Sequence, residues 1–241
     1  MAIPYYSRTD CIGKDALLDS LYILPILLFS IVVHEVAHGW MALHLGDSTA
    51  RDSGRLTLNP IPHIDPIGSI VIPLLSYLSA GSVFIAWAKP VPINPANFRN
   101  FRRDDILVSV VGPFSNLLMA FCCAVSYVLA ERLFGPQSLI ENNLRSQIAM
   151  FLIRMFAAGI TLNIFLAVFN LIPVPPLDGS HVLSSILPPE IGERYRKIGF
   201  FGILLVILLM RLDLFRNFIF TIVTTVRIPY EIFVRKFLLT I

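Results

Sequence analysis

Two histidines and a glutamate lie inside an apolar stretch near the start of the chain, SIVVHEVAHGWMALHLG at residues 30–46. His34 and His38 are four positions apart, so on a helix they share one face and both imidazoles can reach a single metal ion. Glu35 stands beside the first of them, where it can hold a water molecule without binding the metal. Because ionisable side chains at membrane depth are costly, this group needs a partner or a purpose, and a catalytic metal supplies both.

A catalytic zinc ion usually has three protein ligands and keeps a fourth position for water, so one ligand must come from elsewhere in the chain. The strongest candidate is Asp178, in the segment PPLDGSH at residues 175–181. On its own, an aspartate before Gly179 would be a common turn residue. We predict that it is a ligand because the order of the apolar segments places it at the membrane level of His34 and His38.

The composition indicates a membrane protein. Hydrophobic residues make up 56% of the 241 residues and charged residues 15%, and the mean hydropathy is +0.74. Soluble domains have about 45–50% apolar and about 25% charged residues. The basic residues lie mainly between apolar runs, a pattern of membrane topology rather than of nucleic-acid binding. The three cysteines show neither disulfide nor zinc-ribbon spacing, so we expect them to pack as small apolar residues.

The apolar runs predict an all-α polytopic membrane protein, a helical bundle of roughly four to six spans of about 20 residues each. The first run, 16–45, is long enough to cross the membrane, and clear spans follow at 106–130 and 148–172. Apolar sequence resumes at 198 and continues to 226, with an interruption at RLDLFR. The tail from Arg227 is either a span end or an interfacial helix.

Two shorter features separate the first two clear spans. Residues 54–60, GRLTLNP, alternate polar and apolar side chains and predict a small membrane-associated β element. Such a strand could capture an unwound polypeptide by edge pairing. Residues 67–86 are apolar but contain Gly68, Pro73 and Gly81, so a short span, a hairpin and a re-entrant segment remain open.

Lysine and arginine in the connecting segments predict the orientation. The connector between the first two clear spans is the most basic, and the one after the third span is basic again. Both are therefore expected on the cytoplasmic side, with the N-terminus outside. His34, His38 and Asp178 then lie toward the cytoplasmic face. The basic residues of the first of these connectors are Arg51, Arg55, Lys89, Arg99, Arg102 and Arg103.

Three motifs occur in a fixed order over about residues 20–190: the His-Glu-x-x-His segment, GPFSN at 112–116 and NLIPVPPLDG at 170–179. Together they resemble the site-2 protease family, zinc metalloproteases that cleave within the membrane. The chain is similar to the compact subgroup without PDZ or CBS domains, which the segments DPIGS and WAKPVPINP also resemble.

The resemblance implies a role for each matched residue. One Zn²⁺ ion would be bound by His34, His38 and Asp178, with Glu35 as the catalytic base. Asn170 matches an asparagine that supports the oxyanion of the transition state, although an asparagine at a helix end before prolines needs no such role.

Asn116 matches a family asparagine near the substrate path. The alternative for this residue is a hydrogen bond between helices, which is useful in lipid for its own sake.

The function expected from the resemblance is hydrolysis of peptide bonds within or near transmembrane helices. Its partners would be membrane-protein substrates and the lipid bilayer, with no nucleic acid, and the location would be a bacterial inner (plasma) membrane. The whole chain, 1–241, would form one domain with its core at 20–190 and C-terminal helices at 198–241. The alternative is a non-proteolytic metal-binding protein, either a transporter or a degenerate protease that binds helices, but transporters often show repeat symmetry that is not visible here.

Several other polar residues are expected to be solvated in the loop after the first run: His44, Asp47, Asp52 and His63. His181 lies one turn from Asp178, and we expect a loop histidine there, with a supporting contact to the metal site as the alternative.

Overall fold

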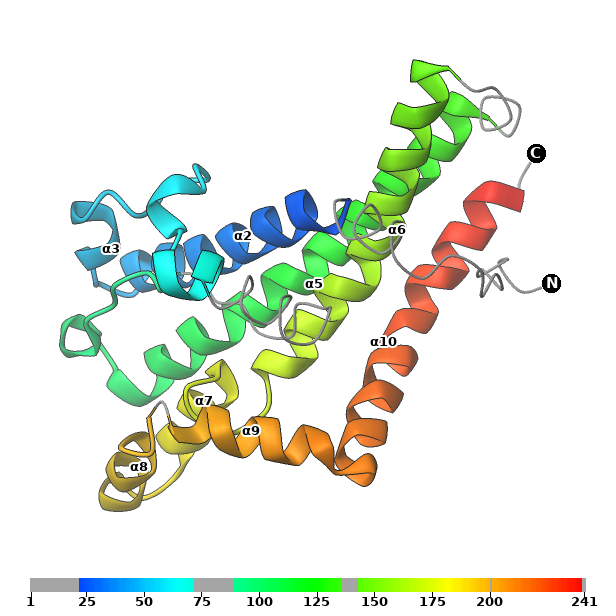
Figure 1. Cartoon of the computed structure of the whole chain (residues 1–241). Helices are drawn as coiled ribbons and strands as arrows, with labels where there is room; N and C mark the ends of the chain where they lie inside the picture. Colours follow the sequence, from blue (N-terminus) through cyan, green and yellow to red (C-terminus); the bar gives the residue numbers. More distant parts are fainter. Residues whose placement is uncertain (1–21, 72–88, 136–142, 200, 240–241) are drawn as a thin grey trace.

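A computed structural model describes residues 22–71, 89–135, 143–199 and 201–239, and these residues contain helices and turns but no strand. Four helices are long and apolar enough to cross a membrane. They are α2 (Ile23–His44), α5 (Phe101–Phe134), α6 (Leu144–Asn170) and α10 (Asp213–Leu239) (Figure 1). The chain is therefore a multi-pass membrane protein, and the all-helical prediction is confirmed. The shorter helices are α3 (Thr49–Asp52), α7 (Asp178–Ile186), α8 (Pro189–Arg196) and α9 (Phe201–Arg211), with single turns at Ile61–His63, Pro66–Val71 and Pro95–Asn97.

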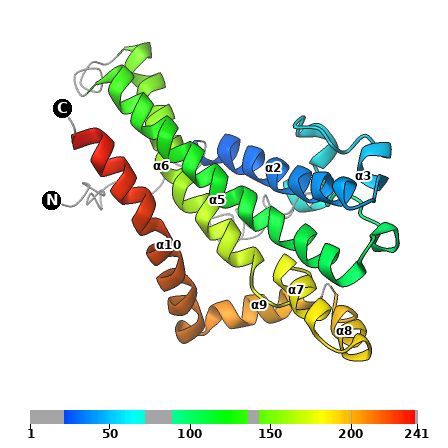
Figure 2. The same cartoon turned by 180° about the vertical axis from the view of Figure 1, so that it is seen from behind.

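Helix α5 is the centre of the bundle, with α2 and α6 along it (Figures 1 and 2). It begins with a reciprocal cap: the Asn100 side chain accepts a hydrogen bond from the Arg103 N–H, while Asp104 Oδ2 accepts one from the Asn100 N–H at 2.8 Å. It ends at Gly135, whose φ of 66° suits a glycine. At 34 residues, α5 is longer than the roughly 20 residues that cross the hydrocarbon core, so the helix extends beyond the apolar layer.

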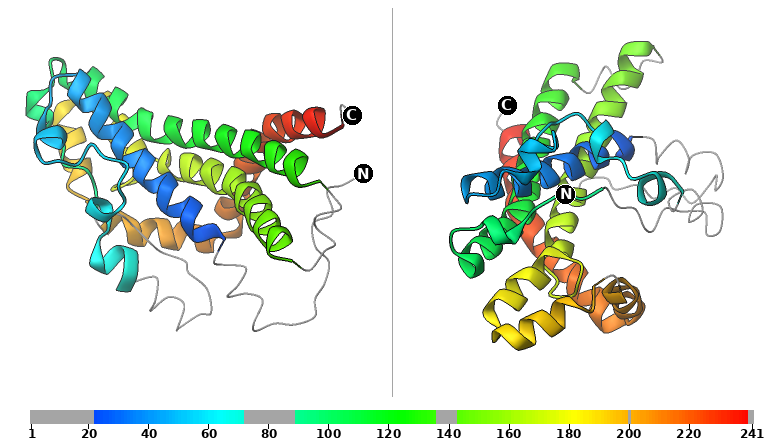
Figure 3. Two further views of the ribbon diagram at one scale, coloured as in Figure 1. Left: turned by 90° about the horizontal axis from the view of Figure 1, so that it is seen from above. Right: turned by 90° about the vertical axis from the view of Figure 1, so that its left-hand side faces the viewer.

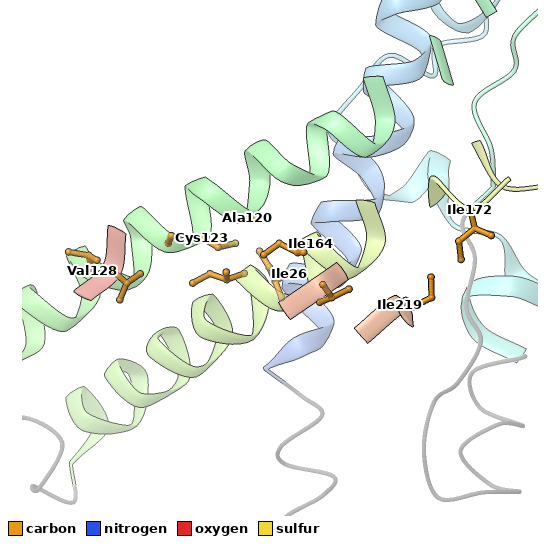
Figure 4. Packing of buried hydrophobic residues seen from close by; sticks show 11 residues of the cluster. Ile26, Ala120, Cys123, Val128, Ile164, Ile172 and Ile219 are labelled. Carbon is orange, nitrogen blue, oxygen red and sulfur yellow. The ribbon is translucent and has the colours of Figure 1, made fainter. Parts of the chain in front are cut away.

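Small residues let the three helices approach closely. A Cβ atom at Gly159 of α6 would lie 2.8 Å from Cys123 Sγ and 2.9 Å from Ile26 Cγ1. Ile26 of α2, Cys123 of α5 and Ile164 of α6 therefore meet in one apolar cluster (Figure 4). Close packing of this kind associates helices in lipid, where no hydrophobic effect drives them together.

The C-terminal helices form an angle. Helix α9 lies crosswise to α10, and α10 runs back along α5 and α6 (Figure 1). The break between them falls at Leu212, within the RLDLFR interruption that the sequence predicted. The tail from Arg227 continues α10, which is the alternative of a span end. Tyr230 Oη donates a hydrogen bond to the Leu117 carbonyl at 3.1 Å and thus fastens α10 to α5.

The expected strand at 54–60 is not present. Its backbone is used in local turns instead: the Arg55 N–H donates to the Ala50 carbonyl at 2.9 Å, and the Asn59 N–H donates to Thr57 Oγ1 at 3.1 Å. Alternation of side chains predicts a strand only where a partner strand is available, and the described residues supply none. Of the segment 67–86, only residues up to Val71 are described, in a helical turn, so its predicted nature is untested.

Asp47 joins the end of α2 to the segment that precedes α5. Its buried carboxylate accepts hydrogen bonds from the Thr49 N–H at 3.1 Å, the Asn94 N–H at 2.7 Å and Asn97 Nδ2 at 2.8 Å. His63 is also buried, and its Nε2 lies 3.0 Å from the Thr57 carbonyl. The prediction that Asp47 and His63 are solvated is therefore wrong, because the loop backbone folds over them. Asp52 and His44 are exposed, as predicted.

Burial alone would raise the pKa of Asp47, but the hydrogen bonds from Thr49, Asn97 and Asn94 outweigh it and lower the pKa below its ordinary value. A depressed carboxyl pKa contributes stability that is fully present above the unfolded pKa of about 4 and is lost as pH falls through the folded pKa. We expect Asp47→Asn to lower the free energy of unfolding at pH 7 by about 1–3 kcal/mol. Thermal unfolding in detergent at pH 7 and below pH 4 checks this, since the difference from the native protein should shrink in acid.

The matched control for that prediction is Asp52→Asn, at an exposed aspartate five residues further on. An equal loss in the free energy of unfolding in both variants would show that the contacts of Asp47 do not stabilise the loop.

Candidate metal centre

The structure brings three residues of the predicted site together. His34 and His38 lie on α2 and are each 7% exposed. Their Nε2 atoms are 3.0 Å apart. Asp178 is the first residue of α7, and its two carboxylate oxygens lie 3.2 Å from His34 Nε2 and 3.3 Å from His38 Nε2. One donor atom from each residue falls within 4.8 Å of the others, as one shared ion requires.

The hydrogen bond made by His38 Nδ1 determines the tautomer of the imidazole, and therefore whether Nε2 can bind a metal ion. His38 Nδ1 lies 2.6 Å from the Val108 carbonyl oxygen on α5. A carbonyl only accepts hydrogen bonds, so Nδ1 carries the proton. In a neutral imidazole the Nε2 atom then presents a lone pair toward Asp178, which is the form that binds a metal.

His34 is held in the same way by Asn116 of α5. The Asn116 side-chain amide lies 3.2 Å from His34 Nδ1, and Asn116 Oδ1 is otherwise buried without a partner. The two ends of an amide have the same shape, and turning this one over places Oδ1 where it accepts the Nδ1 proton. Both the buried oxygen and the imidazole are then satisfied, and His34 Nε2 also faces inward with its lone pair. Asn116 therefore lies directly behind a predicted ligand, and its place near a substrate path stays a prediction.

These donor atoms fit a divalent cation. Two nitrogen lone pairs at 3.0 Å repel one another, and Asp178 Oδ2 accepts no hydrogen bond from the described residues. A cation among the three side chains removes the repulsion and satisfies the carboxylate. Two imidazoles and one carboxylate form a typical catalytic zinc ligand set, which leaves one position open.

Gly112 provides the space for both imidazoles, and sequence reasoning missed this role. A Cβ atom there would lie 2.3 Å from His38 Nε2 and 2.7 Å from His34 Cε1. Val108, Gly112 and Asn116 are spaced by four residues, so they lie along one face of α5, against the two histidines. The only signal in the sequence is the glycine of GPFSN.

Glu35 lies beside the three side chains and is held by the backbone. Its Oε2 accepts a hydrogen bond from the Val91 N–H at 2.8 Å. Val91 is buried between Pro90 and Pro92, which have no N–H to donate. Arg55 Nη2 donates to the Lys89 carbonyl at 2.8 Å and fixes this segment. The sequence gives no signal for the Val91 contact, which depends on how the loop folds back over α2.

In the described part of the chain, Asn170 makes no hydrogen bond or ion pair with His34, His38 or Asp178. At the end of α6, its Nδ2 donates to the Leu166 carbonyl at 3.0 Å. Its predicted role at the oxyanion stays a prediction. His181 lies in α7 rather than in a loop, so that expectation is wrong, and its Nδ1 is 3.5 Å from Asp105 Oδ1.

Comparisons with known proteins agree with this geometry. Residues 95–210 match the profile of peptidase family M50, the site-2 protease family. The chain is 37% identical over 188 residues to a Bacillus subtilis protein named "Putative zinc metalloprotease YwhC", and the match covers 78% of this chain and 79% of that one. The chain belongs to peptidase family M50.

The chain is also similar to mycobacterial proteins named "Putative zinc metalloprotease Rip2". The Mycolicibacterium smegmatis protein is 27% identical over 187 residues, or 76% of this chain and 64% of its own length. The Mycobacterium tuberculosis protein is 32% identical over 163 residues, or 68% of this chain and 56% of its own. No solved structure is significantly similar to the M50 chain described here.

The contact between Asn116 and His34 gives a prediction for this M50 site. Asn116→Asp keeps an oxygen that accepts the His34 Nδ1 proton, whereas Asn116→Leu leaves none. We expect the leucine variant to bind zinc about 10–100-fold more weakly and the aspartate variant to keep most of the affinity. Competition against a chelating dye measures both. An aspartate variant as weak as the leucine variant would mean that the amide donates to His34 and that the assigned tautomer is wrong.

Proposed function

We propose that this M50 chain hydrolyses peptide bonds within or near the transmembrane helices of other proteins, with one Zn²⁺ bound by His34, His38 and Asp178. The observation that carries the proposal is the convergence of these side chains beside Glu35, in a buried site between membrane-length helices. Membership in peptidase family M50 supports the same reaction. Zinc in such a site polarises the scissile carbonyl and lowers the pKa of water.

The contacts of Glu35 determine which of its atoms acts as the base. Its Oε2 is engaged by the Val91 N–H, so Oε1 is the oxygen left to take a proton from the attacking water. The same oxygen then delivers that proton to the nitrogen of the leaving amine. Because Val91 fixes the side chain, Glu35 stays beside the ligands without becoming one.

Asn170 is proposed to donate to the oxygen of the tetrahedral intermediate. A side-chain amide nitrogen carries two hydrogens, and the bond to the Leu166 carbonyl uses one of them. The second is free for the substrate, and a preorganised neutral donor stabilises a developing oxyanion in a site that contains little water.

The proposed orientation places the site toward the cytoplasmic side of a bacterial plasma membrane, with the N-terminus outside. The connectors at the α5 start and after α7 carry the excess of arginine and lysine, including Arg99, Arg102 and Arg103. The loop over Glu35 and the start of α7 lie at this same end of the bundle (Figure 3). A substrate helix must unwind there, since helical amides are protected by their own hydrogen bonds.

The proposal predicts a separation of catalysis from metal binding. Glu35→Gln keeps the Val91 contact but cannot accept a proton, so cleavage of a membrane-helix substrate should fall by about 10²-fold or more. The zinc content should remain one ion per chain, whereas His34→Ala should lose the metal. Cleavage in proteoliposomes and elemental analysis measure the two quantities. Glu190→Gln, at an exposed glutamate of α8, is the matched control.

Native cleavage by the Glu35→Gln protein would contradict the mechanism. Zinc uptake into vesicles without cleavage of any model helix would favour the transporter alternative.

A further inference from the structure

A partly buried ion pair between Asp105 and Arg196 lies near the metal centre, and in the described residues it makes no hydrogen bond with the predicted ligands. Asp105, in the second turn of α5, is 4% exposed. Its Oδ2 accepts hydrogen bonds from Ser185 Oγ at 2.6 Å and from Arg196 Nη2 at 2.9 Å. Ser185 belongs to α7 and Arg196 to α8. One carboxylate of α5 therefore holds the two helices that follow the third predicted ligand.

Arg196 completes the network. Its Nε donates to Ser184 Oγ at 2.8 Å, its Nη2 also donates to Ser185 Oγ at 3.1 Å, and its guanidinium lies over the Phe101 ring at 5.0 Å from the ring centre. Helix α8 approaches α7 closely at this point, because a Cβ at Gly192 would lie 2.5 Å from the Ser184 carbonyl oxygen. A planar guanidinium that makes several directed bonds fixes geometry in a way that a single flexible charge does not.

The positions of these residues in the helices connect the network to the metal centre. Helix α7 has nine residues, with Asp178 at its first position and Ser185 near its last. Helix α5 carries Asp105 one turn before Val108, whose carbonyl oxygen holds His38. A short rigid helix that is fixed at one end to α5 therefore presents its other end to the imidazoles. An ion pair contributes little net stability by itself, whereas several directed bonds from one guanidinium favour a geometric role.

We propose that Asp105, Ser185 and Arg196 are positioning residues that hold α7 against α5 and thereby set the Asp178 carboxylate opposite His34 and His38. The inference rests on the proposed function in one respect, since it takes Asp178 to be a zinc ligand. Without the Asp105 carboxylate, α7 would lose its hydrogen bond from Ser185 to α5 and the link through Arg196, and the orientation of Asp178 would be less restricted.

The test uses the full chain in detergent, with zinc and Co²⁺ as the probes. Asp105→Ala should weaken zinc binding about tenfold or more and alter the visible spectrum of bound Co²⁺, which reports the arrangement of ligands. Asp105→Asn keeps one side-chain oxygen that can accept from both Ser185 and Arg196, as Oδ2 does, and should retain most of the affinity. Ser185→Ala removes the hydrogen bonds of Ser185 with Asp105 and Arg196 but leaves the Asp105–Arg196 ion pair, so it should give a smaller loss in the same direction. This milder variant keeps the test decisive if Asp105→Ala does not fold.

The matched control is Asp104→Ala, at the neighbouring buried aspartate, whose carboxylate bonds to the Asn100 N–H at 2.8 Å instead of to α7. It should leave zinc affinity and the Co²⁺ spectrum unchanged. Native affinity and spectrum in folded Asp105→Ala and Ser185→Ala proteins would overturn the inference, as would an equal loss in the Asp104 control.

The two proposals fail in different ways. If the native protein binds zinc and Glu35→Gln is inactive, native zinc binding by folded Asp105→Ala and Ser185→Ala proteins overturns the positioning role alone. If the native protein binds no zinc, the proposed function fails, and the positioning inference fails with it.

Discussion

The arrangement of this membrane protein depends on one face of helix α5. Residues 105, 108, 112 and 116 follow a spacing of three, four and four, so they lie in a row along the helix. Each meets a different part of the metal centre: Val108 holds His38, Gly112 leaves room for both imidazoles, and Asn116 holds His34. Asp105 extends the row to α7, which carries Asp178. Because a helix is rigid over this distance, the row sets the spacing of residues that lie far apart in the sequence.

This arrangement also explains how charged and polar groups are tolerated between apolar helices. A buried polar group is costly unless it is hydrogen-bonded, and the cost is higher for a charge. Each histidine has a partner on its outer nitrogen, and the Glu35 carboxylate has the Val91 N–H. Among these groups, the inner cluster of two lone pairs and the Asp178 Oδ2 atom remains without a hydrogen bond from the described residues. A cation bound there satisfies all three side chains at once.

Much of the site could be predicted from the sequence because its elements obey local periodicity. The four-residue spacing of His34 and His38 sets their common face on any helix. The depth of Asp178 in the membrane, level with the two histidines, follows from the number of spans that precede it. The second and third clear spans, predicted at 106–130 and 148–172, correspond closely to α5 and α6, since length and apolarity determine them, whereas α10 continues well beyond the apolar run that ends at 226. The break before Asp213 was also predicted, because charged residues interrupt the apolar run there.

Other features could not be predicted because they depend on how segments meet. The Val91 contact with Glu35 and the role of Asp105 require the register between helices and loops. Asp47 and His63 looked like solvated loop residues, yet loop backbone covers both. The alternation at 54–60 predicted a strand, but a strand also needs a partner, which a local pattern does not reveal. His181 was expected in a loop because it follows prolines and Gly179, but helix α7 begins before it, at Asp178.

The most direct test of the account is X-ray absorption at the zinc edge of the purified, zinc-loaded protein. The account predicts a first shell with two imidazole nitrogens at about 2.0–2.1 Å and carboxylate oxygen at about 2.0–2.2 Å, with no sulfur neighbour. In Gly112→Ala, the added Cβ should displace an imidazole and reduce the nitrogen contribution. A sulfur-containing shell, a shell with a single imidazole in the native protein, or an unchanged shell in the Gly112 variant would contradict the central role of this face of α5.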